Sequence, residues 1–209
     1  MEKPSIYTNE PEESHSYERA TLAPSYLKIL DALGLSSESV VLEFGAGAGH
    51  EASYMRESTG ATVVELDTTP AAYEAQPDSK RNFVIGSYEQ LPYATNSFSV
   101  IHSKDALVHI EDKKALFKEF SRVLKPGGTL LLTTEDRNDL DSLKFNMARK
   151  RGGPAMRAYF ITPKKKIESF LDDAGFKPKQ TSSWKPRRDE VSWYDLERMV
   201  FFLENTKES

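Results

Sequence analysis

The chain alternates between continuous apolar runs and segments in which apolar residues recur at helical spacing. A continuous run bounded by Gly, Pro or charged residues predicts a buried strand, whereas helical recurrence predicts an amphipathic helix. Residues 198–204 are ambiguous between the two, but a continuous apolar run between charges favours a strand. The runs predict strands at 40–44, 61–66, 82–86, 98–103, 129–134 and 198–204, and residues 177–184, which follow Gly175, are expected to form a further strand. Helical spacing, with Pro near starts and Gly near ends, predicts helices at 24–34, 50–58, 69–75, 113–124 and 162–175.

The order of these elements indicates the organisation of the chain. Strands and helices alternate with short connections from residue 40 to residue 134, which is typical of a parallel sheet with helices on both faces. With 209 residues the chain is long enough for one such domain, so residues 1–209 are expected to form a single α/β domain. Residues 1–20 are acidic and aperiodic and are expected to form an N-terminal arm or lid. Residues 137–159 are polar and basic and interrupt the alternation as an insertion.

Composition and charge exclude several classes of protein. A net charge of −4 argues against general binding to nucleic acid or to a membrane surface. The absence of Cys excludes disulfides, thiolate zinc sites and cysteine nucleophiles, and it fits a reducing cytoplasm. No apolar stretch reaches the ~18 residues of a membrane span, and the acidic first residues are not expected to form a signal peptide. The His residues lack metal-ligand spacing, so no metal is expected.

The sequence VVLEFGAGAGHEAS (40–53) places alternating glycines directly after a predicted strand. A dinucleotide-binding fingerprint requires G-x-G-x-x-G, but His50 occupies the position of its third glycine. A phosphate-binding loop requires a Lys-Ser or Lys-Thr pair, which does not follow here. The loop therefore lacks both fingerprints, and a smaller adenosine compound stays open as its ligand.

Four stretches together resemble one enzyme family. They are E-x-G-x-G-x-G at 43–49, GSYEQLPYATNSFSVIHS at 86–103, LKPGGTLLL at 124–132 and ITPKKKIESFLDDAGF at 161–176. In this order they resemble the class I S-adenosylmethionine-dependent methyltransferases, of the type 11-like group. The resemblance covers the chain from Pro24 to the C-terminus. It implies a Rossmann-like, doubly wound, mostly parallel seven-stranded sheet, S-adenosyl-L-methionine as cofactor and S-adenosyl-L-homocysteine as product.

The same resemblance implies which residues bind the cofactor. In the family the glycine loop approaches the methionine half, and an acid at the end of the second strand binds the ribose. Asp67 occupies that place, and a carboxylate can accept from two vicinal hydroxyls. Ser87 stands where the family usually has an acid that contacts the adenine amino group, and Lys104 is expected to flank the adenine or ribose. The full expected set is Glu43, Gly45, Ala46, Gly47, Gly49, Asp67, Thr68, Ser87, Tyr88 and Lys104.

The segment HSKDALVHIED (102–112) closely resembles S-R-D-x-I-L-H-I of the phosphoethanolamine N-methyltransferases. There the aspartate contacts the substrate amine and the histidine takes part in catalysis, which implies catalytic roles for Asp105 and His109, with Tyr17 from an N-terminal lid. If the segment is helical, Asp105 and His109 share a face. The residues expected to bind substrate are Tyr7, Arg157 and Tyr159. The alternative is that His109 packs the helix and that the basic insertion, expected to cover the acceptor pocket, is a solvated loop.

The sequence thus predicts an enzyme, a methyltransferase that acts on a small molecule at an amine or phospho-amine nitrogen. Two alternatives stay open. One is an O- or C-methyltransferase of a secondary metabolite, and the other is a catalytically silent S-adenosylmethionine-binding regulatory or scaffold protein. Neither nucleic acid nor a membrane is expected as a partner, because the chain is acidic and lacks the N/D-P-P-Y/F signature after its fourth strand. A cytoplasmic monomer or homodimer is expected.

Overall fold

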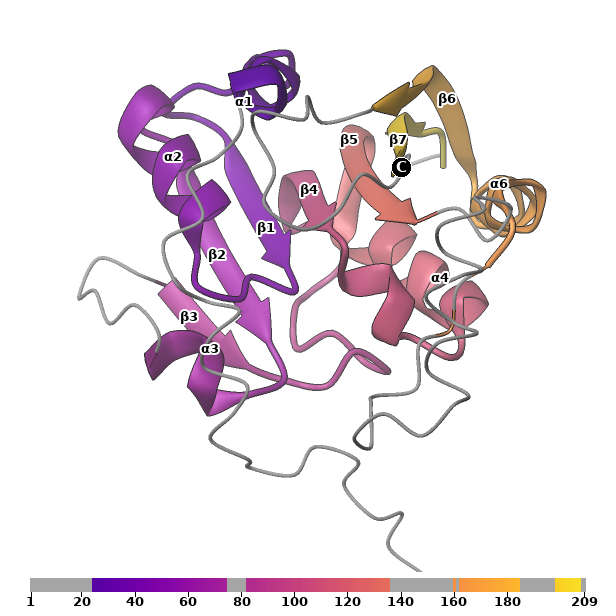
Figure 1. Ribbon diagram of the computed structural model, residues 1–209, viewed down its shortest axis with the longest axis horizontal. Helices are drawn as coiled ribbons and strands as arrows, with labels where there is room; N and C mark the ends of the chain where they lie inside the picture. The colour runs from indigo at the N-terminus through magenta and orange to yellow at the C-terminus, as the bar shows by residue number, and fades with distance from the viewer. Residues whose placement is uncertain (1–23, 75–81, 136–159, 161, 185–197, 208–209) are drawn as a thin grey trace, which may run out of the picture.

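The computed structural model describes residues 24–74, 82–135, 160, 162–184 and 198–207. The strands of this part of the chain form one seven-stranded sheet in the order β3-β2-β1-β4-β5-β7-β6 (Figure 1). They are β1 (Val40–Phe44), β2 (Thr62–Asp67), β3 (Asn82–Ile85), β4 (Phe98–Lys104), β5 (Leu124–Glu135), β6 (Phe176–Trp184) and β7 (Arg198–Asn205).

The pairing of the strands makes the sheet mostly parallel. Strands β1 to β5 pair in parallel, whereas β7 lies antiparallel between β5 and β6. The chain runs outward from β1 through β2 to β3 and then returns to β4 on the other side of β1. Open α/β sheets bind ligands at the carboxyl ends of the strands that flank such a reversal. The predicted Rossmann-like, doubly wound fold is confirmed, and it directs attention to the ends of β1 and β4.

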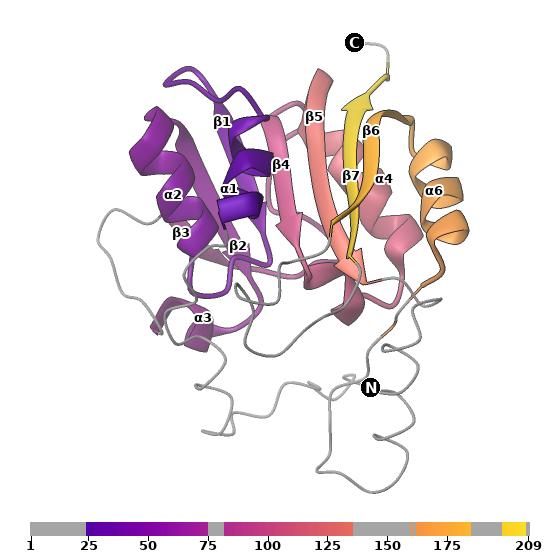
Figure 2. The ribbon, with the colours of Figure 1, turned by 45° about the horizontal axis from the view of Figure 1, so that its top comes forward.

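Helices cover both faces of the sheet (Figure 2). They are α1 (Pro24–Asp31), α2 (His50–Thr59), α3 (Pro70–Glu74), the 3₁₀ helix η2 (Ala106–His109), α4 (Lys113–Val123) and α6 (Lys164–Asp173). On one face α1 and α2 contribute Tyr26 and Met55 to a core that includes Val41. On the other face α4 contributes Phe117 to a larger core that includes Leu42. Val41 and Leu42 are neighbours on β1, and they enter different cores because successive side chains of a strand point to opposite faces.

The predicted elements agree with the observed ones apart from local differences. Residues 198–204 belong to a strand, which decides the ambiguity of that segment. Strand β5 begins at Leu124 and not at residue 129, because Leu124 already pairs with Phe98 before an irregularity between Phe98 and Val100. The stretch from Asp105 to His109 forms a 3₁₀ turn and not an α-helix. The sequence therefore located the strands and long helices but not the geometry of this turn.

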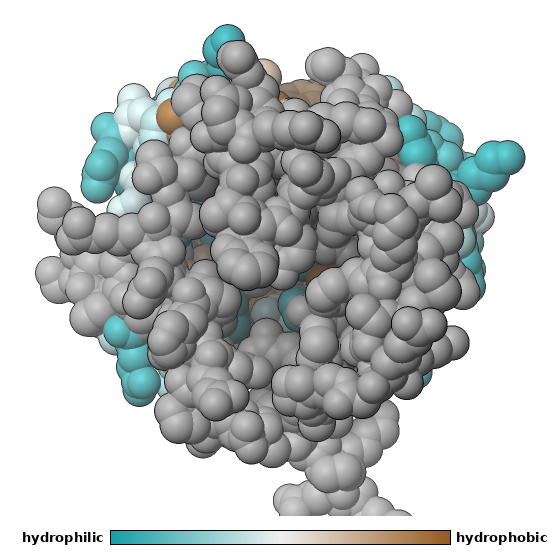
Figure 3. All heavy atoms as spheres, in the orientation of Figure 1, coloured by the Kyte–Doolittle hydropathy of each residue, from teal (hydrophilic) through white to brown (hydrophobic). Residues whose placement is uncertain are grey.

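The surface of the described residues is mainly hydrophilic where it is visible at the rim of the molecule (Figure 3). Among these residues the large apolar side chains with high exposure are Tyr73, at 37%, and Ile85, at 55%. Tyr73 lies on α3, after β2, and Ile85 ends β3, so both belong to the carboxyl ends of the strands on that side of the sheet. This is the end at which the glycine loop also leaves β1.

Candidate active site

The glycine loop connects β1 to α2 through a backbone that favours glycine. Gly45, Gly47 and Gly49 have φ values of 73°, 51° and 79°, in the left-handed region where other residues are strained. A Cβ atom on Gly45 would lie 2.3 Å from the Cβ of Ala106 in η2. The backbone N–H groups of Gly45 and Ala46 both donate to the carbonyl of Leu66, at 2.8 and 3.1 Å. The loop is therefore held between the end of β2 and the turn after β4.

Asp67 ends β2 with its carboxylate turned toward this loop. Its Oδ2 accepts from the N–H of Gly47 at 3.0 Å, and its Oδ1 accepts from the N–H of Thr69 at 3.2 Å. The residue is 8% exposed. The Thr69 hydroxyl also donates to Oδ1, at 3.4 Å. A carboxylate has about four acceptor positions, so these three bonds fix its orientation and leave it capacity for a ligand hydroxyl. Thr68, also in the expected cofactor set, follows directly in the chain.

Ser87 and Tyr88 follow β3 on the same edge of the sheet. Ser87 is exposed, and its hydroxyl accepts from the N–H of Glu89 at 3.1 Å. The Tyr88 ring packs on Phe44, with ring centroids 4.5 Å apart. Its hydroxyl lies 3.9 Å from the position that a Cβ atom on Gly45 would take. Tyr88 thus brings a phenol to the glycine loop from the side on which Ser87 lies.

A buried chain of polar side chains connects α1 to β1 through β4. The Tyr26 hydroxyl contacts Nε2 of His102 at 2.7 Å, and Nδ1 of His102 contacts Oε2 of Glu43 at 2.6 Å. Burial, together with the negative charges of Glu51 and Glu43, raises the pKa of Tyr26 well above its usual value. Burial also raises the pKa of Glu43, although the contact with His102 opposes this. A neutral Tyr26 phenol can donate to Nε2, which leaves the Nδ1 proton for Glu43.

This chain was not predicted from the sequence, where Glu43 was assigned to the cofactor. His102 and Glu43 lie directly opposite each other in the parallel register of β1 and β4. They are 0% and 2% exposed. The signal that could have found the pair is the occurrence of two ionisable residues within otherwise apolar strands, because buried polar groups need partners.

Lys104 ends β4 and lies beside this chain. Its ammonium contacts Oε1 of Glu51 in α2 at 2.6 Å and stands 4.8 Å from the centre of the Tyr26 ring. Burial alone would raise the pKa of Glu51, but the charge of Lys104 and its hydrogen bond outweigh this and lower the pKa. In the sheet β1 separates β4 from β2, the strand that carries Asp67. The structure therefore places Lys104 near the glycine loop but across β1 from the acid expected to bind the ribose.

Asp105 stands at the point where β4 turns into η2. It has a φ of 58°, and its N–H donates to the carbonyl of Thr133 on β5 at 3.0 Å. His109 ends η2 and is partly buried. Because η2 is a single 3₁₀ turn, the helical spacing expected to align Asp105 with His109 does not apply. The two residues lie at the two ends of one turn, and Ala106 of this turn lies against the glycine loop.

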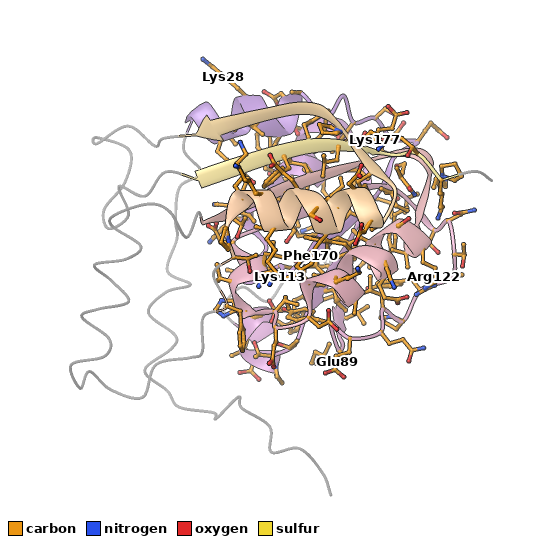
Figure 4. The ribbon with its side chains drawn as sticks, turned by 90° about the vertical axis from the view of Figure 1, so that its right-hand side faces the viewer. Lys28, Glu89, Lys113, Arg122, Phe170 and Lys177 are labelled. Atoms are coloured by element: carbon orange, nitrogen blue, oxygen red, sulfur yellow. The ribbon has the colours of Figure 1, made fainter. Side chains whose placement is uncertain are left out.

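The chain segment that precedes α6 is attached to the same turn. The N–H of Phe160 donates to the carbonyl of Val108 at 2.6 Å. The Lys113 amine, at the start of α4, donates to the carbonyls of Ile110 and Phe160 at 2.6 and 2.5 Å (Figure 4). Burial, with a smaller contribution from Lys166, lowers the pKa of Lys113 to about 8. Phe160 is therefore bonded to Val108, the residue that precedes His109, and to the Lys113 side chain.

Several predictions concern residues that the structure does not describe. Tyr7, Tyr17, Arg157 and Tyr159 lie outside the described residues, as do the arm and the whole insertion at 137–159. In the described part of the chain, His, Asp and Glu side chains form no group of three or more that could hold a metal ion. Within the same part, none of the helices has the length and apolar character needed to span a membrane.

Comparison with known proteins identifies the class. The profile of a methyltransferase domain matches residues 42–132. Phosphoethanolamine N-methyltransferase 1 of Triticum aestivum is 31% identical over 156 residues, which cover 71% of this chain and 30% of that protein. Sterol 24-C-methyltransferase of Pneumocystis carinii is 26% identical over 175 residues, which cover 77% of this chain and 46% of that protein. The matches thus span less than half the length of these curated relatives.

A solved structure agrees with these matches. Phosphoethanolamine N-methyltransferase 2 of Haemonchus contortus, in complex with phosphomonomethylethanolamine and S-adenosylhomocysteine, superposes with a TM-score of 0.73 at 20% identity. The superposition covers 94% of this chain and 57% of that one. The chain belongs to the class I S-adenosylmethionine-dependent methyltransferases. Its predicted class and its predicted cofactor, S-adenosylmethionine, are both confirmed.

Proposed function

We propose that this protein transfers the methyl group of S-adenosylmethionine to the nitrogen of a small amine or phospho-amine. The observation that carries the proposal is the contact between the turn after β4 and the glycine loop. Ala106 lies so close to Gly45 that a Cβ atom on Gly45 would overlap it. Asp105 and His109 flank Ala106 in this turn. The turn that carries an acid and an imidazole therefore lies next to the loop that holds the cofactor of the class.

The residues at the ends of β1 and β2 fit the cofactor. The loop from Gly45 to Gly49 carries small side chains or none, so a ligand can approach its backbone closely. The Asp67 carboxylate is oriented by Gly47 and Thr69 and has acceptor capacity for ribose hydroxyls. When bound, S-adenosylmethionine supplies an electrophilic methyl group on a sulfonium sulfur. Ser87 and Tyr88 then belong to the side of the site that receives the adenine.

The acceptor nitrogen has to be aligned with that methyl group and must carry a free electron pair. The Asp105 carboxylate attracts a cationic amine to the turn after β4, because opposite charges in a partly buried site attract strongly. In this proposal His109 takes the amine proton, because imidazole is the side chain suited to proton transfer near neutral pH. In this proposal Tyr17 and Tyr7 close the site from the N-terminal arm.

The attachment of Phe160 supports the assignment of the substrate phosphate. Phe160 is bonded to Val108 and to Lys113, next to His109. Tyr159 and Arg157 precede Phe160 by one and three residues, within one short stretch of chain. A guanidinium and a phenol are suitable donors to a phosphate oxygen. We therefore assign these two residues to the phosphate of a phospho-amine, and the insertion at 137–159 to a cover over the acceptor.

The same proposal extends to setting and assembly. We propose a cytoplasmic enzyme with a small-molecule acceptor, on the basis of the acidic net charge and the absence of Cys. We propose a monomer or a homodimer of one domain over residues 1–209. Sedimentation of the purified chain measures the assembly state, and a larger complex would contradict this part.

A screen with labelled cofactor tests the function. Amines, phospho-amines, phenols and carbon acids are offered, and transfer to nitrogen is expected. His109→Ala should lower turnover roughly 10²–10⁴-fold with nearly unchanged affinity for S-adenosylhomocysteine. Asp105→Asn should raise KM for a cationic acceptor. Asp112→Asn is the matched control, because it removes one charge from the same connection, and Asn can still cap α4 through the bond to Ala115.

The outcomes separate the alternatives. Transfer only to a phenol or a carbon acid would replace the proposal with an O- or C-methyltransferase. Tight binding of S-adenosylhomocysteine without transfer to any acceptor would indicate a silent cofactor-binding protein. Full turnover of both the His109 and the Asp105 variants on the true acceptor would make this pair structural.

A further inference from the structure

An ion pair between two partly buried side chains lies beside the glycine loop. The Lys104 ammonium and the Glu51 carboxylate are 2.6 Å apart, and their side chains are 30% and 12% exposed. Glu51 stands two residues after Gly49, in the first turn of α2, and Lys104 directly precedes Asp105. The pair is thus fixed by its neighbours at the same strand ends as the cofactor loop, and the Lys104 side chain keeps 30% of its surface exposed.

The pair rests on a rigid support. Lys104 stands over the face of the Tyr26 ring, and an aromatic face attracts a cation. Tyr26 is held in turn by His102, and His102 by Glu43, in the buried chain between α1 and β1. Side chains locked by such supporting bonds keep a binding site in one geometry. The support gives Glu43 a positioning role through His102, in addition to its place in the E-x-G-x-G-x-G pattern.

We propose that Lys104 and Glu51 form the subsite for the charged amino-acid end of the cofactor. This inference rests on the function proposed above. That end of S-adenosylmethionine carries one carboxylate and one ammonium group. Lys104 binds the carboxylate, and Glu51 binds the ammonium.

The chemistry of the pair suits a zwitterion. An ammonium has three donors and a carboxylate has about four acceptor positions, so each partner can bind a second charge without releasing the first. Two opposite charges side by side also complement a ligand whose own two charges are separated by a single carbon. The location agrees, because β1 separates this pair from Asp67 at the ribose position. The methionine and ribose portions of the cofactor are then bound on opposite sides of the glycine loop.

Two ligands that differ only at the amino-acid end test the subsite. S-adenosylhomocysteine has this end, whereas 5′-methylthioadenosine keeps the adenosine thioether and lacks it. Calorimetry should show that Lys104→Met and Glu51→Gln each weaken S-adenosylhomocysteine at least about tenfold, the scale of hydrogen bonds to charged groups. Affinity for 5′-methylthioadenosine should stay within about twofold of wild type. Lys114→Met is the control, because Lys114 forms an ion pair of 2.7 Å with Asp173 that joins α4 to α6.

The possible results distinguish this subsite from the proposed function. Weakening of both ligands to the same extent in the Lys104 and Glu51 variants would overturn the subsite, because the pair would then only support the fold. Unchanged binding of S-adenosylhomocysteine in both variants would overturn it too, while the function stands. Failure of wild type to bind S-adenosylhomocysteine would overturn the function itself.

Discussion

Removal of one hydroxyl group measures what the buried chain from α1 to β1 contributes to stability. Tyr26→Phe keeps the aromatic ring beneath Lys104 but removes the hydroxyl group that lies 2.7 Å from Nε2 of His102. His102 is 0% and Tyr26 1% exposed, so water cannot easily replace the lost bond. A buried polar group left without its partner costs about 1–3 kcal/mol. In a chain of this size each kcal/mol lowers Tm by roughly 2–4 °C.

Tyr54→Phe provides the matched comparison. The Tyr54 hydroxyl donates to Oδ1 of Asp31 at 2.8 Å, and this bond also joins α2 to α1, but it is exposed. Water can replace it, and its loss should change the free energy of unfolding by less than about 0.5 kcal/mol. Urea unfolding of both variants, analysed for a common m value, gives the two losses. Equal small losses in the two variants would refute the view that the buried chain holds α1 on the sheet.

Two further perturbations follow from single positions. Gly45→Ala should destabilise the protein by more than about 2 kcal/mol and abolish binding of S-adenosylhomocysteine, because φ is 73° and the added Cβ meets Ala106. Gly34 has a similar φ of 62° with open space around it, so Gly34→Ala tests the backbone strain alone. An equal effect of the two substitutions on binding would contradict the role of the clash with Ala106. Burial lowers the pKa of Lys113 from its ordinary value of 10.5 to about 8 in the folded protein, so the unfolded chain binds more protons between these two pH values. Relative to Lys113→Met, the free energy of unfolding of wild type should therefore rise between about pH 8 and pH 10.5. A difference between the two proteins that does not change with pH in urea titrations would contradict the lowered pKa of Lys113.

The glycine loop and the acid after β2 could be predicted because each depends on local chemistry. Glycines at the end of a strand and a carboxylate at the end of the next one remain recognisable without knowledge of the packing. The buried chain could not be predicted in this way. Its bonds join residues 76 and 59 positions apart, and they depend on the register of β1 with β4 and on the placement of α1. The contact of the Glu43 carboxylate with His102 cannot be found from the sequence, because it depends on that register.

The turn after β4 shows a second limit of sequence reasoning. The spacing of Asp105 and His109 suggested one face of an α-helix, but spacing alone does not reveal how a strand ends. In the structure the N–H of Asp105 still bonds to β5, and the chain then reverses through a left-handed residue into a 3₁₀ turn. In this turn Ala106 lies against Gly45. The sequence does not show this packing against the glycine loop, and it left the conformation of the turn undetermined.

The end of β4 offers two opposite charges in consecutive positions, and their surroundings divide them between two tasks. The Lys104 ammonium lies on the face of the sheet that α1 and α2 cover, where Tyr26 and Glu51 hold it. Asp105 opens the turn whose next residues, Ala106 and Leu107, enter the core of the opposite face. In the proposed site the Lys104 charge binds the cofactor and the Asp105 charge binds the acceptor, and the glycine loop lies against the turn that begins there. If Lys104 and Asp105 instead served the same ligand, charge reversal at either position should change cofactor affinity alike. The structure predicts that only the change at Lys104 does so, which calorimetry with S-adenosylhomocysteine can decide.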